Sequence, residues 1–108
     1  MSIAETDKID GLGVSKQDNK ILILLLTDHF IWDDEEAHIW ALEDKINAYA
    51  GFIESKQYER VYPNRMFEEF VIQICFLYPY PESCEQFLKT ATEQLAPLHI
   101  TFQAKIGS

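Results

Sequence analysis

The sequence predicts an α+β domain, a two-layer sandwich in which two helices cover one face of a four-stranded, mainly antiparallel sheet. Short apolar runs of strand length stand before, between and after two segments whose apolar residues recur at helical spacing, which gives the order β-β-α-β-α-β. The composition, 47% hydrophobic and 25% charged, is that of an ordinary globular protein, and 108 residues fit one domain. We expect a flexible tail over residues 1–8 and a single domain over residues 9–106.

A β-hairpin is predicted at the start of this domain. Residues 9–15 form a weak strand that Gly11 and Gly13 weaken further. Residues 17–19, Gln-Asp-Asn, are typical of a turn. Residues 20–27, KILILLLT, are apolar on both faces and bounded by turn residues, as in a buried strand. The two strands are therefore expected to pair.

A long helix is expected to begin at Asp33, with Glu36 three residues later in the spacing of a capping box. The acidic residues 33–36 suit the positive end of the helix dipole. The helix should end near residues 55–57. Its buried stripe comprises Ile39, Leu42, Ile46, Tyr49 and Ile53.

The second half predicts a strand, a helix and a last strand. Residues 68–78 alternate between two mostly apolar sets and end at Pro79 and Pro81, which favours an interior strand. Ser83 with Gln86 has capping-box spacing at the start of the second helix. Pro97 closes this helix, and residues 99–106 form the last strand. The buried stripe of the helix comprises Cys84, Phe87, Leu88, Ala91 and Leu95.

The segments 27–55 and 61–63 resemble a family of small uncharacterised bacterial proteins, known as a domain of unknown function. The shared pattern is a strand ending in Asp-His, then Trp, acidic residues and His, then a Lys-Ile-Asn-x-Tyr helix and a Phe-Ile-Glu-Ser exit. The resemblance covers nearly the whole chain and implies no established activity. The matching positions are Asp28, His29, Trp32, His38, Lys45, Ile46, Asn47, Tyr49, Phe52, Ile53, Glu54 and Ser55.

The charge balance limits the partners. Nine Lys and Arg residues against 18 Asp and Glu give a net charge of −9. Such a surface argues against nucleic acid and anionic membranes. It suits a basic partner protein, and the alternative is that the acidity only keeps a cytosolic protein in solution. Residues 1–8 have no apolar core of a signal peptide, and the longest apolar run, 21–26, is too short to span a bilayer. We therefore expect a cytoplasmic protein in which Cys75 and Cys84 are reduced and buried.

One candidate site stands where the second strand meets the long helix. Asp28, His29, Asp34 and His38 converge on this corner and could bind a divalent metal or act as an acid–base pair. The alternative is structural, with the carboxylates capping the helix and His38 packed and hydrogen-bonded. Arg60 and Arg65 on the later loop could bind a carboxylate or phosphate, or simply pair with the acidic surface. No cofactor motif is present, so no cofactor is expected.

Two surfaces are candidates for self-association. The outer side of the long helix carries Trp40 among small residues, namely Ala37, Ala41 and Ala48. The sheet face opposite the helices should display three of residues 21–26 beside the smaller set of the third strand, which comprises Val71, Gln73, Cys75 and Leu77. The sheet face is the larger patch, and we expect it to form a homodimer.

These observations favour a non-enzymatic protein that works through protein–protein contact. Binding of a basic partner, as by an immunity-type inhibitor of a bacterial toxin, is one version of this function. The alternative is a small metal-binding protein or enzyme that uses the Asp/His corner. The sequence contains no catalytic motif.

Overall fold

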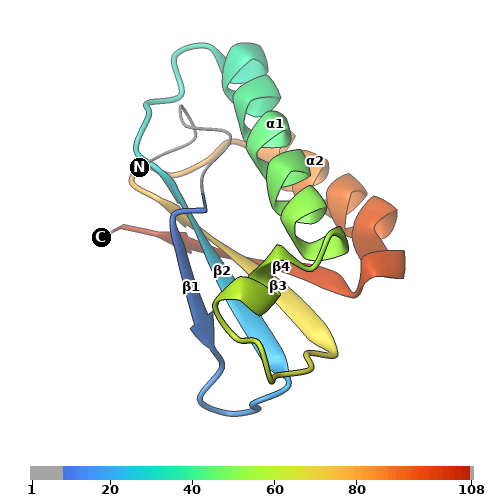
Figure 1. Cartoon of the computed structure of the whole chain (residues 1–108). Coiled ribbons are helices and arrows are strands. Elements are labelled where there is room, and N and C mark those ends of the chain that lie inside the picture. The colour runs from blue at the N-terminus through green and yellow to red at the C-terminus, as the bar shows by residue number, and fades with distance from the viewer. Residues whose placement is uncertain (1–8, 108) are drawn as a thin grey trace.

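The computed structural model describes residues 9–107 and has the predicted order of elements (Figure 1). The tail predicted over residues 1–8 lies outside the described residues. A single-turn helix, η1, follows the long helix, and another, η2, precedes the last strand. The elements are β1 (Gly11–Val14), β2 (Ile21–Asp28), α1 (Glu35–Glu54), η1 (Gln57–Arg60), β3 (Glu69–Phe76), α2 (Glu82–Leu95), η2 (Ala96–Leu98) and β4 (Ile100–Ile106).

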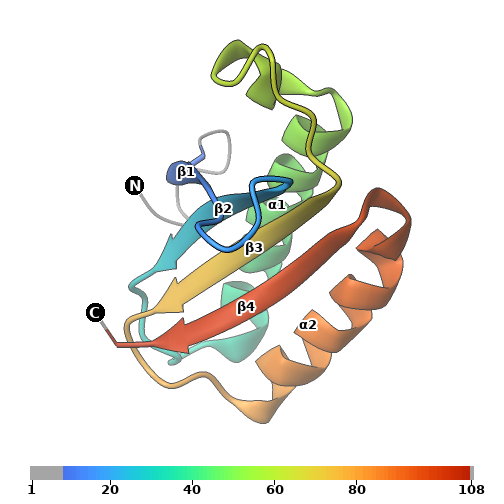
Figure 2. The same cartoon turned by 90° about the horizontal axis from the view of Figure 1, so that it is seen from below.

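The sheet is mixed, and the prediction of a mainly antiparallel sheet was wrong. Its strand order is β1-β2-β3-β4. Only the β1–β2 hairpin is antiparallel, whereas β2–β3 and β3–β4 are parallel. The reason is that each helix runs back along the sheet and returns the chain to the end at which the preceding strand began. Two β-α-β units therefore follow one another, and the strands of each unit are parallel. In Figure 2, α1 passes behind the sheet and α2 runs beside β4.

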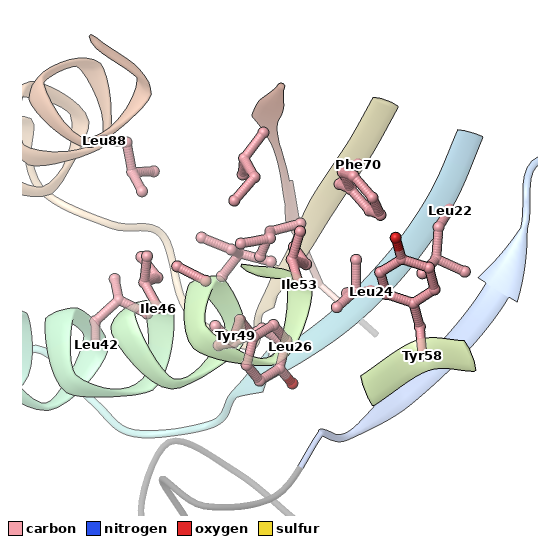
Figure 3. Packing of buried hydrophobic residues seen from close by; sticks show 14 of the residues in the cluster. Leu22, Leu24, Leu26, Leu42, Ile46, Tyr49, Ile53, Tyr58, Phe70 and Leu88 are labelled. Carbon is pink, nitrogen blue, oxygen red and sulfur yellow. The ribbon is translucent and has the colours of Figure 1, made fainter. Parts of the chain in front are cut away.

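The core lies between the helices and one face of the sheet (Figure 3). Along β2, the buried residues Leu22, Leu24 and Leu26 alternate with half-buried ones, which marks the two faces. Along β3, the residues that alternate with the set expected to face outward are likewise buried, namely Phe70, Ile72, Ile74 and Phe76. The predicted stripe of α1 faces this core, although Ile39 is only half-buried.

Both helices begin at residues other than those predicted. The N-cap of α1 is Asp34 rather than Asp33, because Asp34 has extended backbone and its Oδ1 accepts a hydrogen bond from the Ala37 N–H at 3.2 Å. The N-cap of α2 is Pro81 rather than Ser83. The Ser83 hydroxyl instead donates to Glu35 Oε1 at 2.7 Å, which links the first turns of the two helices. Cys84, Leu88 and Ala91 of α2 are buried as predicted.

A buried polar network ties β1 to α1. Asp10 Oδ1 lies 3.2 Å from Lys45 Nζ, and the two side chains are 2% and 0% exposed. The Tyr49 hydroxyl accepts from the Asp10 N–H at 2.9 Å and donates to the Leu25 carbonyl. Asp10 Oδ2 accepts from the Thr27 N–H at 2.8 Å. Burial raises the pKa of Tyr49, so its hydroxyl keeps the proton that it donates. The short, glycine-containing β1 is thus held by polar contacts as well as by its strand pairing.

Candidate site at the Asp28–His38 corner

Asp28 is the last residue of β2, at the carboxyl edge of the parallel part of the sheet. Ligand sites of open α/β sheets occur at this edge. The Leu77 N–H donates to the Asp28 carbonyl at 2.8 Å, which fixes the backbone where β3 ends. Asp28 is 2% exposed, so its carboxylate depends on protein partners for stabilisation.

His38, in the first turns of α1, is the main partner of that carboxylate. His38 Nε2 lies 2.5 Å from Asp28 Oδ2, and His38 is 6% exposed. Asp28 Oδ1 accepts from the Phe30 N–H at 3.2 Å. Both oxygens of an ionised carboxylate only accept, so with Asp28 ionised it is His38 Nε2 that donates this hydrogen bond. His38 Nδ1 is buried with no hydrogen-bond partner within the described residues.

Aromatic side chains hold the imidazole in place. The Trp32 ring stacks on the His38 ring with centroids 3.5 Å apart and planes 8° apart. Phe30 meets the same ring edge-on at 6.2 Å. Trp32 in turn contacts Phe76 at 6.1 Å, which connects the loop after β2 to the core. The orientation of the imidazole is therefore set by its carboxylate and by its neighbours together.

Cys84, at the start of α2, lies fully buried near this corner. Burial, with smaller contributions from the charges of Asp28 and Glu85, raises the pKa of its thiol to about 12. The thiol is therefore protonated at neutral pH. A protonated thiol is neither a nucleophile nor a metal ligand.

A pocket of about 220 Å³ opens beside His38. One side is formed by the loop after β2 and the other by the first turns of α1. Its lining is mostly apolar, with two exposed carboxylates and no lysine or arginine. The lining residues are Phe30, Ile31, Asp33, Asp34, Ala37, His38 and Ala41.

The structure brings together only part of the predicted Asp/His group. Asp28 and His38 pair, whereas His29 is exposed with its ring against Phe30, 5.1 Å between centroids, and Asp34 caps α1. Within residues 9–107, no group of three or more His, Cys, Asp or Glu side chains is placed to hold a metal ion. The sequence did not predict that Phe30 and Trp32 contact the His38 ring. Trp32 is one of the residues shared with the resembling family, and that shared position was the one sign of its importance.

The other predicted site residues lie on the surface or on the second sheet face. Arg60, in η1, and Arg65, in the loop after it, are both exposed. Trp40 is 60% exposed on the outer side of α1, where Ala37 is exposed and Ala41 and Ala48 are half-buried.

The third-strand set faces away from the helices as expected: Leu77 is 44% exposed, and Val71, Gln73 and Cys75 are half-buried. The prediction that both cysteines are buried therefore holds only for Cys84. Because side chains of a strand alternate between the two faces, Cys75 lies on the sheet face that the helices leave uncovered.

Comparison with known proteins gives a family and no activity. No helix in the described part of the chain is long and apolar enough to cross a membrane. No curated protein and no solved structure matches this chain. A family model does match, over residues 1–108, and the chain therefore belongs to DUF6572, a family of unknown function.

Proposed function

We propose that this protein acts through contact with other polypeptide chains, as a cytoplasmic homodimer whose acidic surface binds a basic partner. The observation that carries the proposal is the sheet face opposite the helices, which we term the open face. Its central positions are Ile21, Ile23, Leu25, Val71, Gln73 and Cys75, all half-buried.

The open face is aliphatic over β2 and the adjoining part of β3, whereas β4 brings the exposed polar residues Thr101, Gln103 and Lys105 to it. Ile23 pairs with Val71 across β2 and β3, and Leu25 pairs with Gln73. One-sided sheets normally display polar residues on their free side. A contiguous apolar patch on a folded chain typically marks a contact surface. A symmetric dimer would cover this patch with a second copy of itself.

Gly11 widens this patch. A Cβ at Gly11 would lie 3.0 Å from Leu25 Cδ1, so the Leu25 side chain leans across the backbone of β1. Gly13, opposite Ile23, likewise brings no side chain to this face. The two glycines that weaken β1 as a strand therefore extend the aliphatic surface toward the edge of the sheet.

The net charge of −9 supports binding of a basic partner, because an acidic surface attracts a basic protein. Two copies of the chain carry the same charge and would therefore associate through their apolar surface. An immunity-type inhibitor is one protein of this kind.

The oligomeric state tests the dimer directly. Light scattering at high micromolar concentration should give the mass of two chains for the wild type. Ile23→Lys, at the centre of the open face, and Leu77→Lys, at its end, should both give monomers. Circular dichroism of each variant checks that the fold is retained.

Trp40→Ala is the matched control, because Trp40 is exposed on the opposite layer of the molecule. It should leave the dimer intact. A strictly monomeric wild type would overturn the dimer, and a Trp40→Ala monomer would move the interface to α1.

A further inference from the structure

We infer that strand β4, at the edge of the sheet, receives an extended segment of the basic partner protein as an additional strand. This inference rests on the proposed function and names the part of the molecule that the partner contacts. Figure 2 shows β4 as the outermost strand on the side of α2. It pairs with β3 and with no other described strand.

Alternate residues of β4 direct their backbone N–H and carbonyl groups away from β3. The Phe70 N–H donates to the His99 carbonyl at 3.0 Å, and the Gly107 N–H donates to the Phe76 carbonyl at 2.8 Å. Residues 99 and 107 therefore face β3, and by the alternation of a strand so do the odd-numbered residues between them. The even-numbered residues present their hydrogen-bonding groups to the edge. They are Ile100, Phe102, Ala104 and Ile106.

Little in β4 opposes pairing with another strand. Natural edge strands are kept apart by shortness, proline, bulges or charges. β4 has seven residues with no proline, and Lys105 is its one charged residue. Ala104 is exposed and Ile106 is 55% exposed, although both belong to the set that faces the helices. The helix layer therefore leaves the second half of this edge accessible.

A pocket of about 250 Å³ lies where this edge begins. It is formed by the end of α2, the start of β3 and the first residues of β4. In strand addition, main-chain hydrogen bonds give affinity and pockets for alternate side chains give specificity. Both features meet here, because two residues of β4 also line the pocket. The lining residues are Glu69, Thr92, Ala96, His99, Ile100 and Thr101.

The charge around this pocket favours a basic side chain. Glu69 supplies a carboxylate, and no described lysine or arginine lines the pocket. α2 ends beside it, and the last turn of that helix carries no basic residue against its partial negative charge of about one half. Lys105 lies four residues beyond Thr101 on the same face and disfavours a cation at the other end of β4. The bound segment should therefore carry its lysine or arginine at the pocket.

The first test uses acetyl-Arg-Thr-Val-Thr-Val-Thr-amide, a basic peptide with strand alternation. The matched control is the same peptide methylated at both valine nitrogens, which keeps the side chains and the charge but blocks strand pairing. Titration of ¹⁵N-labelled protein should give saturable shifts and slower hydrogen exchange for the amides of Phe102, Ala104 and Ile106 with the unmethylated peptide only. Equal shifts with the methylated peptide would overturn the inference.

A backbone variant tests the edge from the side of the protein. Ala104→Pro removes an N–H that faces the edge and keeps the hydrogen bonds to β3, so it should abolish peptide binding. Circular dichroism checks that the fold is retained. If this variant unfolds, the methylated peptide alone decides the result. A folded Ala104→Pro protein that binds as the wild type does would contradict strand addition.

Charge variants test the pocket. Glu69→Gln should weaken binding by about twofold to fivefold, the range for an exposed ion pair. Glu93→Gln removes the same charge from an exposed position of α2 outside the pocket and should have no effect. The peptide with Gln in place of Arg should bind the wild type more weakly by the same factor. Equal weakening by the two variants, with shifts spread beyond β4, would show a general acidic field and overturn the site.

Light scattering separates a partner segment from a second copy of β4. Ile23→Lys disrupts the open face and leaves β4 unchanged, so this variant should be monomeric and should still bind the peptide. An Ile23→Lys dimer that Ala104→Pro dissociates would show that a second copy occupies the edge, and it would overturn the inference. A dimeric wild type that does not bind the peptide would leave the open face standing, so the two failures give different results.

Discussion

Asp28 and His38 are ten residues apart in the chain, and their side chains meet in a buried 2.5 Å contact that joins the end of β2 to the beginning of α1. Within the described residues, removal of the imidazole leaves the buried Asp28 carboxylate with the backbone N–H of Phe30 as its remaining hydrogen-bond donor. We expect His38→Ala to lower the free energy of unfolding by about 1–3 kcal/mol.

Urea denaturation at neutral pH measures this loss. His38→Gln, whose amide can still donate, should recover part of it. A His38→Ala protein as stable as the wild type would show that the pair contributes no net stability.

The Asp10–Lys45 pair should show strong coupling. Lys45→Met keeps the apolar stem but leaves the buried Asp10 carboxylate without its cation, and we expect a loss of about 3–5 kcal/mol. Asp10→Asn in the Lys45→Met background should restore much of it, since no charge then remains buried. A double-mutant cycle in urea measures the coupling. Additive effects would contradict it.

Alkaline pH should destabilise the fold through Cys84. The thiol loses its proton near pH 9 when unfolded but near pH 12 when folded. Between these values the unfolded state binds fewer protons, so stability falls by up to about 1.4 kcal/mol per pH unit. Burial of Tyr49 adds a loss of the same sign above its ordinary pKa of 10.0.

The free energy of unfolding, measured from pH 7 to pH 11, should therefore decline above pH 9 in the wild type. The decline should be shallower for Cys84→Ala, and Cys75→Ala is the matched control because Cys75 lies half-buried on the open face. An identical decline in both variants would assign the effect to other groups.

The two thiols should also differ in reactivity. A thiol reagent should modify Cys75 in the native protein, more slowly at concentrations where the open face is covered by a second copy. Cys84 should react only after unfolding, because it is fully buried with a raised pKa. Mass spectrometry of partly labelled protein identifies the site. Rapid native labelling of Cys84 would contradict its placement.

The sequence predicted the elements and the buried stripes well, since both follow from periodicity. Leu42, Ile46, Tyr49 and Ile53 recur at the spacing of one helix face, and all four are buried. Strand direction does not follow from periodicity. The apolar runs of β2 and β3 read the same in parallel and antiparallel sheets, and only the helical crossover between them sets their direction.

The site was predictable in part. Residues near one strand end and one helix start were expected to converge, and Asp28 and His38 do so. Whether His29 joins them depends on the backbone of residues 29–34, for which local pattern gives no rule. The polar network of Asp10 depends on Lys45, 35 residues away, and such a contact leaves no trace in a short window of sequence.

The buried polar network that ties β1 to α1 through Asp10 and Lys45 has a further consequence for the solubility of the chain. Residues 21–26 of β2, ILILLL, have the uncharged, apolar and proline-free composition of segments that assemble into cross-β fibrils. β3 protects one edge of this strand, and the four-residue β1 protects the other. If β1 detaches once the Asp10–Lys45 contact is lost, the edge of this segment becomes available to another chain. We therefore expect the buried Asp10–Lys45 pair to protect the chain against aggregation. Its loss should produce turbidity or dye-binding fibrils at temperatures below the unfolding of the rest of the domain.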